Sequence, residues 1–169
     1  MADKQKEQNK KEPAQSVLSK SLLIGFVAGS LWGGLGVVAY YFHFTEVSAA
    51  SFVFRSFWQT EWTGSLLGEV LAVLVVAILS IVTALLYYML FKSKNGMWPG
   101  VILAAVLFLL IFVVLDPLFP AIPSLTKLSS DTLVTTACLY LLYGVFIGYS
   151  ISYEFHQFNE PANDYSNES

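Results

Sequence analysis

The residue with the clearest potential for chemistry is Glu69, a carboxylate within the apolar stretch Leu66–Phe91. An ionisable side chain inside a membrane-length apolar segment is typical of proton or cation coupling. A second interpretation places Glu69 near the headgroups, in the first turn of a helix, where the helix dipole favours a carboxylate. Counting back about twenty residues from Lys92 ends the hydrocarbon near Ala72. We therefore favour the second interpretation.

Polar side chains of two apolar segments each follow one helical face. In the segment with Glu69, Tyr87 lies on the same face as the carboxylate, and in Thr132–Glu154 the hydroxyls of Thr136 and Tyr143 share a face. Such faces turn toward other helices rather than toward lipid, so together they would line a polar path. The candidate functional residues are Glu69, Arg55, Asp116, Tyr87, Thr136 and Tyr143.

The charges on the same predicted side of the membrane as Glu69 allow two interpretations. They form one external polar cluster, or they are unrelated surface charges. The residues concerned are Arg55, Glu61, Glu69, Asp116, Asp131 and His43.

Sequence motifs of the common enzyme classes are absent. The chain has no GxxxxGK phosphate loop, no GxGxxG before a helix, no HExxH, and one cysteine, Cys138, which we expect to be buried. Its two histidines, His43 and His156, are predicted on opposite sides of a membrane, so they cannot share a site. We therefore expect a protein that is not an enzyme and has no metal, no cofactor and no nucleic-acid partner.

The composition indicates an integral membrane protein. Of 169 residues, 56% are hydrophobic and only 12% are charged, with a mean hydropathy of +0.62. Soluble domains are nearer one quarter charged. The apolar residues form long runs between short polar segments, so the first expected partner is the lipid bilayer.

The apolar runs predict an all-α integral membrane four-helix bundle. The expected spans are residues 21–42, 66–91, 98–115 and 132–154, which lie in one transmembrane domain of residues 21–155. The aromatic-rich loop 43–63 predicts a short interfacial helix in the first external loop. The polar segments 1–20 and 156–169, the second of which is acidic, predict disordered tails.

Glycines in two spans are spaced for close helix packing. Gly25, Gly29, Gly33 and Gly36 form one stripe on the first span, and Gly144 and Gly148 form a GxxxG pair on the last. The stripe packs within the monomer or forms the seam of a homodimer. We favour packing within the monomer.

Lysine and arginine positions predict how the chain is threaded. With four spans and a cytoplasmic amino terminus, seven of these residues are inside and only Arg55 and Lys127 are outside. Both termini are then cytoplasmic. The seven inside are Lys4, Lys6, Lys10, Lys11, Lys20, Lys92 and Lys94.

Three stretches of sequence resemble a known family. They are Cys138-Leu-Tyr-Leu-Leu-Tyr-Gly-Val-Phe-Ile-Gly-Tyr-Ser-Ile-Ser-Tyr-Glu154, Tyr41-Phe-His-Phe-Thr-Glu46 and Asp116-Pro-Leu-Phe-Pro120. The chain from about Leu22 to Glu154, without either tail, resembles the YqhR-like family of conserved membrane proteins of spore-forming Gram-positive bacteria. The resemblance implies a small multi-pass protein of the bacterial cell membrane and carries no catalytic residues.

Two functions are favoured on the sequence, and an intramembrane enzyme or lipid-modifying protein, whose external carboxylates would hold a metal, ranks third. The first is a non-enzymatic membrane protein that packs against or assembles with other membrane proteins or with a second copy of itself. The alternative is a small transporter or permeation unit, in which the polar faces of the second and fourth spans form a path with Glu69.

Overall fold

The structure, a computed structural model, describes residues 14–58, 61–91 and 98–159, and these residues contain helices and no strand. The elements in order are α2 (Ala14–Tyr41), η1 (Ser51–Arg55), η2 (Glu61–Gly64), α3 (Leu66–Phe91), α4 (Trp98–Leu109), η3 (Leu110–Val114), η4 (Asp116–Leu118) and α5 (Ser130–Asn159). The segments η1 and η3 are π-helical turns, and η2 and η4 are 3₁₀ turns.

Three of the helices are long and apolar enough to cross a membrane: Val17–Tyr41, Leu66–Phe91 and Ser130–His156. A fourth apolar helix, Trp98–Val114, is shorter. It ends at Asp116-Pro117, because the residue before a proline avoids the α-helical region. Many large apolar side chains face outward, such as Leu23 on α2 and Met89 on α3. Lipid rather than water suits this surface.

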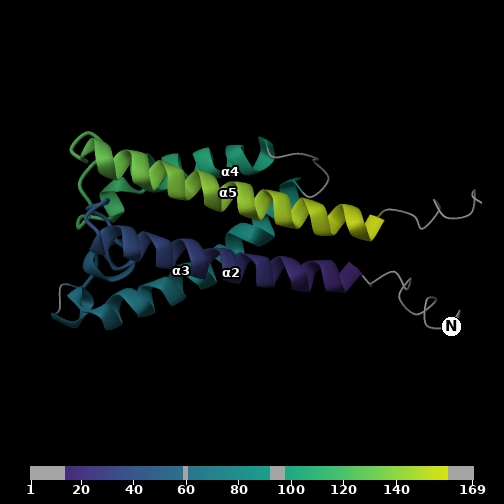
Figure 1. The fold of residues 1–169 in the computed structure, drawn as a ribbon, viewed down its shortest axis with the longest axis horizontal. Helices are drawn as coiled ribbons and strands as arrows, with labels where there is room; N and C mark the ends of the chain where they lie inside the picture. The colour runs from purple at the N-terminus through teal and green to yellow at the C-terminus, as the bar shows by residue number, and fades with distance from the viewer. Residues whose placement is uncertain (1–13, 59–60, 92–97, 160–169) are drawn as a thin grey trace, which may run out of the picture.

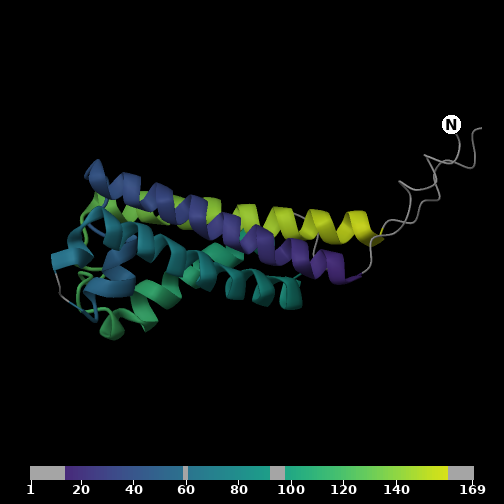
Figure 2. The same ribbon diagram turned by 90° about the horizontal axis from the view of Figure 1, so that it is seen from below.

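The helices run alternately between two ends of the molecule (Figure 1). We call the end with residues 42–58, 61–65 and 115–129 the capped end, and the end where α2 begins and α5 finishes the tail end. Helix α2 packs against α3 and α5, and α4 packs against α5, whereas α3 and α4 make almost no contact with each other. Figure 2 shows the short segments of both loops gathered at the capped end.

Small residues bring α2 and α3 together. A Cβ added at Gly25 would meet Ala84 Cβ at 2.7 Å, and one at Gly29 would meet Ala77 Cα at 2.6 Å. At Gly33 the nearest atom lies at 3.5 Å, and at Gly36 nothing lies within 4 Å. Within the monomer, the predicted glycine stripe therefore lies against the backbone of α3 at Gly25 and Gly29, faces side chains of α3 at Gly33, and has open space at Gly36.

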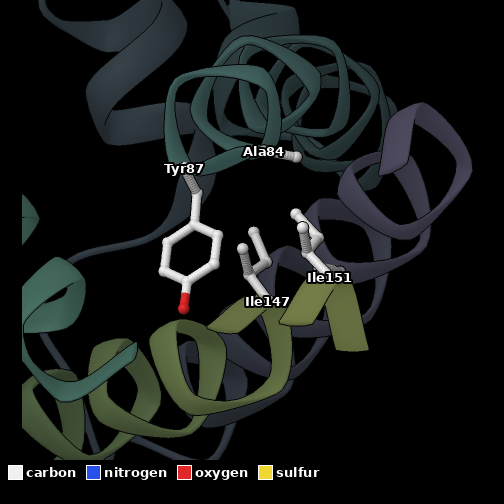
Figure 3. Close-up of a cluster of buried hydrophobic side chains, with 5 residues drawn as sticks. Ala84, Tyr87, Ile147 and Ile151 are labelled. Carbon is white, nitrogen blue, oxygen red and sulfur yellow. The ribbon is translucent and has the colours of Figure 1, made fainter. Parts of the chain in front are cut away.

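A second contact between small residues joins α4 to α5 near the tail end. Gly144 and Gly148 both lie against Gly100, a residue that the sequence analysis overlooked. Beside them is a buried apolar cluster that includes Tyr87 from α3 and Ile147 and Ile151 from α5 (Figure 3). Helices α3, α4 and α5 therefore converge at the tail end.

Several boundaries differ from the predicted ones. Helix α2 begins at Ala14, so the prediction of a disordered tail to residue 20 is wrong for residues 14–20. This additional turn is held because Val17 is buried against the protein and Lys20 Nζ lies 2.9 Å from Glu154 Oε2. Helix α5 extends to Asn159, beyond the predicted end of the transmembrane domain at residue 155. Residues 1–13 and 160–169 lie outside the described residues.

Two further observations concern single predictions. Helix α3 coincides with the predicted span 66–91, and the aromatic loop contains the short helical segments η1 and η2. Cys138 was expected to be buried and is instead exposed on α5, because the helix turns this position away from its neighbours. The thiol is therefore on the surface that faces lipid in a membrane.

Candidate functional site

The carboxylate of Glu69 is a buried charged group at the capped end that accepts three hydrogen bonds. It lies in the first turn of α3 and only 1% of the residue is exposed. Ser48 Oγ donates to Oε1 at 2.7 Å, and the backbone N–H of Ala50 donates to Oε2 at 3.2 Å. Arg55 Nη2 donates to Oε1 at 2.8 Å. Glu69 therefore fixes the loop that follows α2 onto the start of α3.

Arg55 completes this network from η1. Its Nη1 donates to the hydroxyl of Tyr40 at 3.1 Å and to Ser51 Oγ at 3.4 Å, and its Nε donates to the carbonyl of Thr63 at 3.3 Å. The guanidinium also lies 5.3 Å from the centroid of the Tyr40 ring, a cation–π distance. The Arg55 side chain is 23% exposed and the Glu69 side chain 1%, so the pair is largely out of solvent.

This geometry adds to the second interpretation of Glu69. The residue is in the first turn of its helix, as expected, and the protein itself encloses its carboxylate. The reason is that the loop 45–55 folds back over the helix start, where Ser48, Ala50 and Arg55 replace the water that a carboxylate otherwise binds. A carboxylate that accepts from three donors, one of them a paired cation, is suited to holding structure rather than to moving protons.

The remaining loop contacts extend the cap across the helices. The N–H of Glu46 donates to Thr132 Oγ1 at 3.0 Å, which ties the first loop to the start of α5. The ring of Phe52 lies 5.7 Å from that of Phe112 and 5.6 Å from that of Phe119. These edge-on aromatic contacts join the first loop to η3 and to the second loop. His43, with a φ of 61°, makes the turn after α2.

Beneath this cap is a cavity of about 630 Å³. It is lined by α2, α3, the end of α4 with η3, and α5, and the first loop covers it. Its lining residues Leu79, Val82 and Leu110 are also exposed, so they mark a mouth between α3 and η3. The lining is mainly apolar and contains no charged residue. The cavity occupies the space that opens because α3 and α4 separate toward the capped end (Figure 1).

The other predicted site residues lie in three places: the cavity wall, a position nearer the tail end, and the second loop. Tyr143 lines the cavity, and its hydroxyl lies 2.7 Å from Ser80 Oγ, which donates to the carbonyl of Gly25. Thr136 also lines the cavity, whereas Tyr87 lies nearer the tail end, with its hydroxyl 3.3 Å from Ser152 Oγ. The polar faces of α3 and α5 therefore meet at two points.

The predicted external cluster is not a single group of residues. Asp116 begins η4 and accepts a hydrogen bond from Ser124 Oγ at 3.2 Å, within the second loop. Asp131 is exposed in the first turn of α5. Within residues 14–58, 61–91 and 98–159 there is no group of three or more histidine, cysteine or carboxylate side chains that could hold a metal ion. Among the candidates within the described part of the chain, Glu69 and Arg55 are joined by an ion pair.

The partners that complete the network of Glu69 and Arg55 could not be identified from the sequence. Ser48 and Ala50, just before η1, donate to Glu69. Ser51, the first residue of η1, and Tyr40, in the last turn of α2, accept from Arg55. A short run of serine and alanine beside a buried carboxylate is a weak signal, because the same residues occur in ordinary turns. The indole of Trp32 on the cavity wall was also missed.

Comparison with known proteins gives a consistent assignment. A family model described as "Conserved membrane protein YqhR" matches residues 1–166. A relative from Bacillus subtilis (strain 168), named "Uncharacterized protein YqhR", is 40% identical over 163 residues, which cover 94% of this chain and 91% of the relative. No solved structure matches. The family model thus extends beyond the 22–154 range of the sequence resemblance on both sides, to residues 1–166. The chain belongs to the YqhR family of conserved membrane proteins.

Proposed function

We propose that this chain is a non-enzymatic multi-pass membrane protein that acts by binding. It receives another component of the membrane, a lipid or a segment of another membrane protein, at the opening between α3 and η3. The observation that carries this proposal is the cavity under the cap, whose mouth is marked by Leu79, Val82 and Leu110. A cavity that opens sideways through apolar side chains is accessible from lipid rather than from water.

The proposal includes a threading. All four apolar helices, the shorter α4 among them, cross the bilayer as a four-helix bundle with both termini in the cytoplasm, because this threading keeps seven of nine lysines and arginines inside. The capped end is then extracellular, and the cavity lies in the outer half of the bacterial cell membrane. A reporter that is active only outside the cell, fused to either terminus, tests the threading. Activity at one terminus alone would contradict it.

Binding is a better proposal than transport. The hydroxyls of Ser80 and Tyr143 bond to each other, and Glu69 is engaged by three donors and does not line the cavity. The polar groups of the predicted path therefore have partners within the protein. Assembly with other membrane proteins, or with a second copy of this chain, remains part of the proposal through the same opening.

Photo-crosslinking in native membranes tests the proposed opening. A photoreactive residue is placed at Leu110, on the mouth, and for comparison at Leu35, which is on α2 and does not line the cavity. The two positions are 41% and 43% exposed, so bulk lipid reaches both equally. We expect a discrete adduct from position 110 only. Identical adducts from both positions would refute a specific binding surface.

A further inference from the structure

We propose that the cavity binds an isoprenoid quinone, which is a flat ring with two carbonyl groups and a long hydrocarbon tail. The ring lies beneath the cap, the hydroxyls of Thr136 and Tyr140 donate to a ring carbonyl oxygen, and the tail leaves through the mouth. This inference rests on the proposed function and names its ligand. The unpaired hydroxyls select the carbonyl, the aromatic roof selects the ring, and the aliphatic mouth selects the tail.

Two hydroxyls on the cavity wall have no partner within the described protein. Thr136 and Tyr140 of α5 line the cavity, and neither hydroxyl makes a hydrogen bond to another group of residues 14–58, 61–91 and 98–159. Thr136 is only 8% exposed. The indole Nε1 of Trp32 is also unpaired but is sealed within the protein, whereas the oxygens of Thr136 and Tyr140 keep accessible surface. Buried hydroxyls normally have a partner, and at membrane depth no water supplies one, so it is left to the ligand.

The two hydroxyls lie close to each other on α5. Thr136 and Tyr140 are separated by about one helical turn, so they share a face of the helix. A tyrosine side chain on a helix leans toward the helix N-terminus, which brings its hydroxyl over the turn that contains Thr136. The ring of Tyr140 also packs edge-on against that of Phe112 in η3, with centroids 6.2 Å apart. A carbonyl oxygen has two lone pairs, so it accepts from both hydroxyls at once.

Aromatic and aliphatic side chains occupy different parts of the cavity wall. Phe52, Phe57 and Phe119 line it beneath the cap, and the ring of Phe119 lies 5.6 Å from that of Phe52 and 6.3 Å from that of Phe57. The mouth between α3 and η3 is aliphatic, with Leu79 and Leu110 among its residues. A flat ring packs well against aromatic side chains, and a hydrocarbon tail suits the mouth. A plain acyl chain would make no use of the aromatic roof.

The lining and the depth both favour an uncharged ring. Of the described residues that line the cavity, none is charged, so none pairs with a charged headgroup. Thr136 lies about 9 Å along α5 from Ser130. A phospholipid with its headgroup at the membrane surface keeps its ester carbonyls above this depth. A quinone ring has no charge to leave at the surface and can lie there.

Native mass spectrometry of the purified full chain tests the proposal, with a menaquinone that has a four-unit isoprenoid tail as the probe. Squalene supplies an isoprenoid chain without a ring or an oxygen, and dioleoylglycerol supplies ester carbonyls without a ring. The variants that remove one hydroxyl each are Thr136→Val and Tyr140→Phe. Their matched controls are Thr135→Val and Tyr149→Phe, which lie on the same helix and do not line the cavity.

We expect one retained menaquinone per chain in the wild type, and at least tenfold lower retention of squalene and of dioleoylglycerol. Thr136→Val and Tyr140→Phe each weaken menaquinone binding about fivefold, the equivalent of one net hydrogen bond. Thr135→Val and Tyr149→Phe leave the binding unchanged. All variants are compared at equal folded fraction, measured by thermal unfolding in the same detergent.

Equal retention of squalene or of dioleoylglycerol would overturn the quinone as the ligand, and so would undiminished menaquinone binding in both Thr136→Val and Tyr140→Phe. A discrete adduct at position 110 without retained menaquinone would overturn the quinone alone and leave the proposed function standing. Identical adducts at positions 110 and 35 would instead overturn the proposed function, and the quinone with it.

Discussion

At the tail end, Gly25 lies directly against α3, and Gly144 lies against Gly100 of α4, so the backbones touch. At the capped end α3 and α4 stand apart, and loop residues and a cavity fill the space between the helices. Each end has an ion pair. Lys20 and Glu154 at the tail end are 40% and 25% exposed, whereas Arg55 and Glu69 at the capped end are 23% and 1% exposed.

The difference shows that packing of small residues and polar contacts stabilise different parts of the same membrane protein. Where backbones approach closely, van der Waals contact holds the helices, and a hydrogen bond from Ser80 Oγ to the carbonyl of Gly25 adds to it. Where α3 and α4 separate, a loop must be fixed in place, and a buried charge with several donors does this with a defined geometry. The first arrangement excludes ligands. The second leaves room for one.

The largest expected effect is the loss of the buried ion pair. Glu69→Ala removes the partner of Arg55 and leaves three donors unsatisfied, so we expect a loss of about 3–5 kcal/mol in the free energy of unfolding. Unfolding in detergent measures the loss, and hydrogen exchange over residues 45–58 should rise while that of the tail end does not. The control is Asp131→Ala, at an exposed position. Unchanged protection of residues 45–58 in Glu69→Ala would show that the pair does not hold the cap.

An intermediate effect is expected from widening the tail end. Gly144→Ala places a Cβ 2.7 Å from Ala104 Cβ, so the two helices must move apart at a cost of about 1–3 kcal/mol. Gly34→Ala has nothing within 4 Å and is expected to stabilise α2 by about 0.5–1 kcal/mol, through helix propensity alone. Thermal unfolding in the same detergent compares them. A stability gain in both variants would mean that the glycine contact at Gly144 is dispensable.

The smallest effect belongs to the exposed ion pair. Because Lys20 and Glu154 both contact solvent, we expect their interaction to contribute about 0.2–1 kcal/mol. A double-mutant cycle with Lys20→Met and Glu154→Gln isolates this contribution. A coupling as large as that between Arg55 and Glu69 would remove the contrast between the two ends.

Much of the fold follows from local patterns in the chain. The mainly apolar run between Ser65 and Lys92, with Glu69 as its single charge, predicts α3 with the bounds that the structure shows, because a polar residue flanks each end. Glycine spacing predicts the close approach of a helix at Gly25 and Gly29. It does not identify α3 as that helix, since any helix with small residues satisfies the same pattern.

The site depends on contacts that no local pattern contains. Arg55 and Glu69 meet because the chain between them passes through η1 and η2 and folds back over the start of α3. Both residues could therefore be identified as candidates from the sequence, but their ion pair could not be predicted. The cavity exists because α3 and α4 stand apart. A missing contact between two helices produces no periodic pattern in the sequence. For the same reason Trp32 reads as an ordinary aromatic residue of a membrane helix.

The π-helical turn η3 at the end of α4 has a consequence for the bilayer around the protein. The 12 residues of α4 and the 5 of η3 extend over about 25 Å, whereas the 26 residues of α3 extend over about 39 Å. With both helices crossing as proposed, a short and a long helix flank the mouth. Lipid beside the short helix must thin to match it, at a cost of a fraction of a kcal/mol per Å. A lipid that is compressed at the entrance gives up less favourable interaction energy when it leaves the lipids around it. The mismatch therefore favours entry of lipid into the cavity at this side of the molecule.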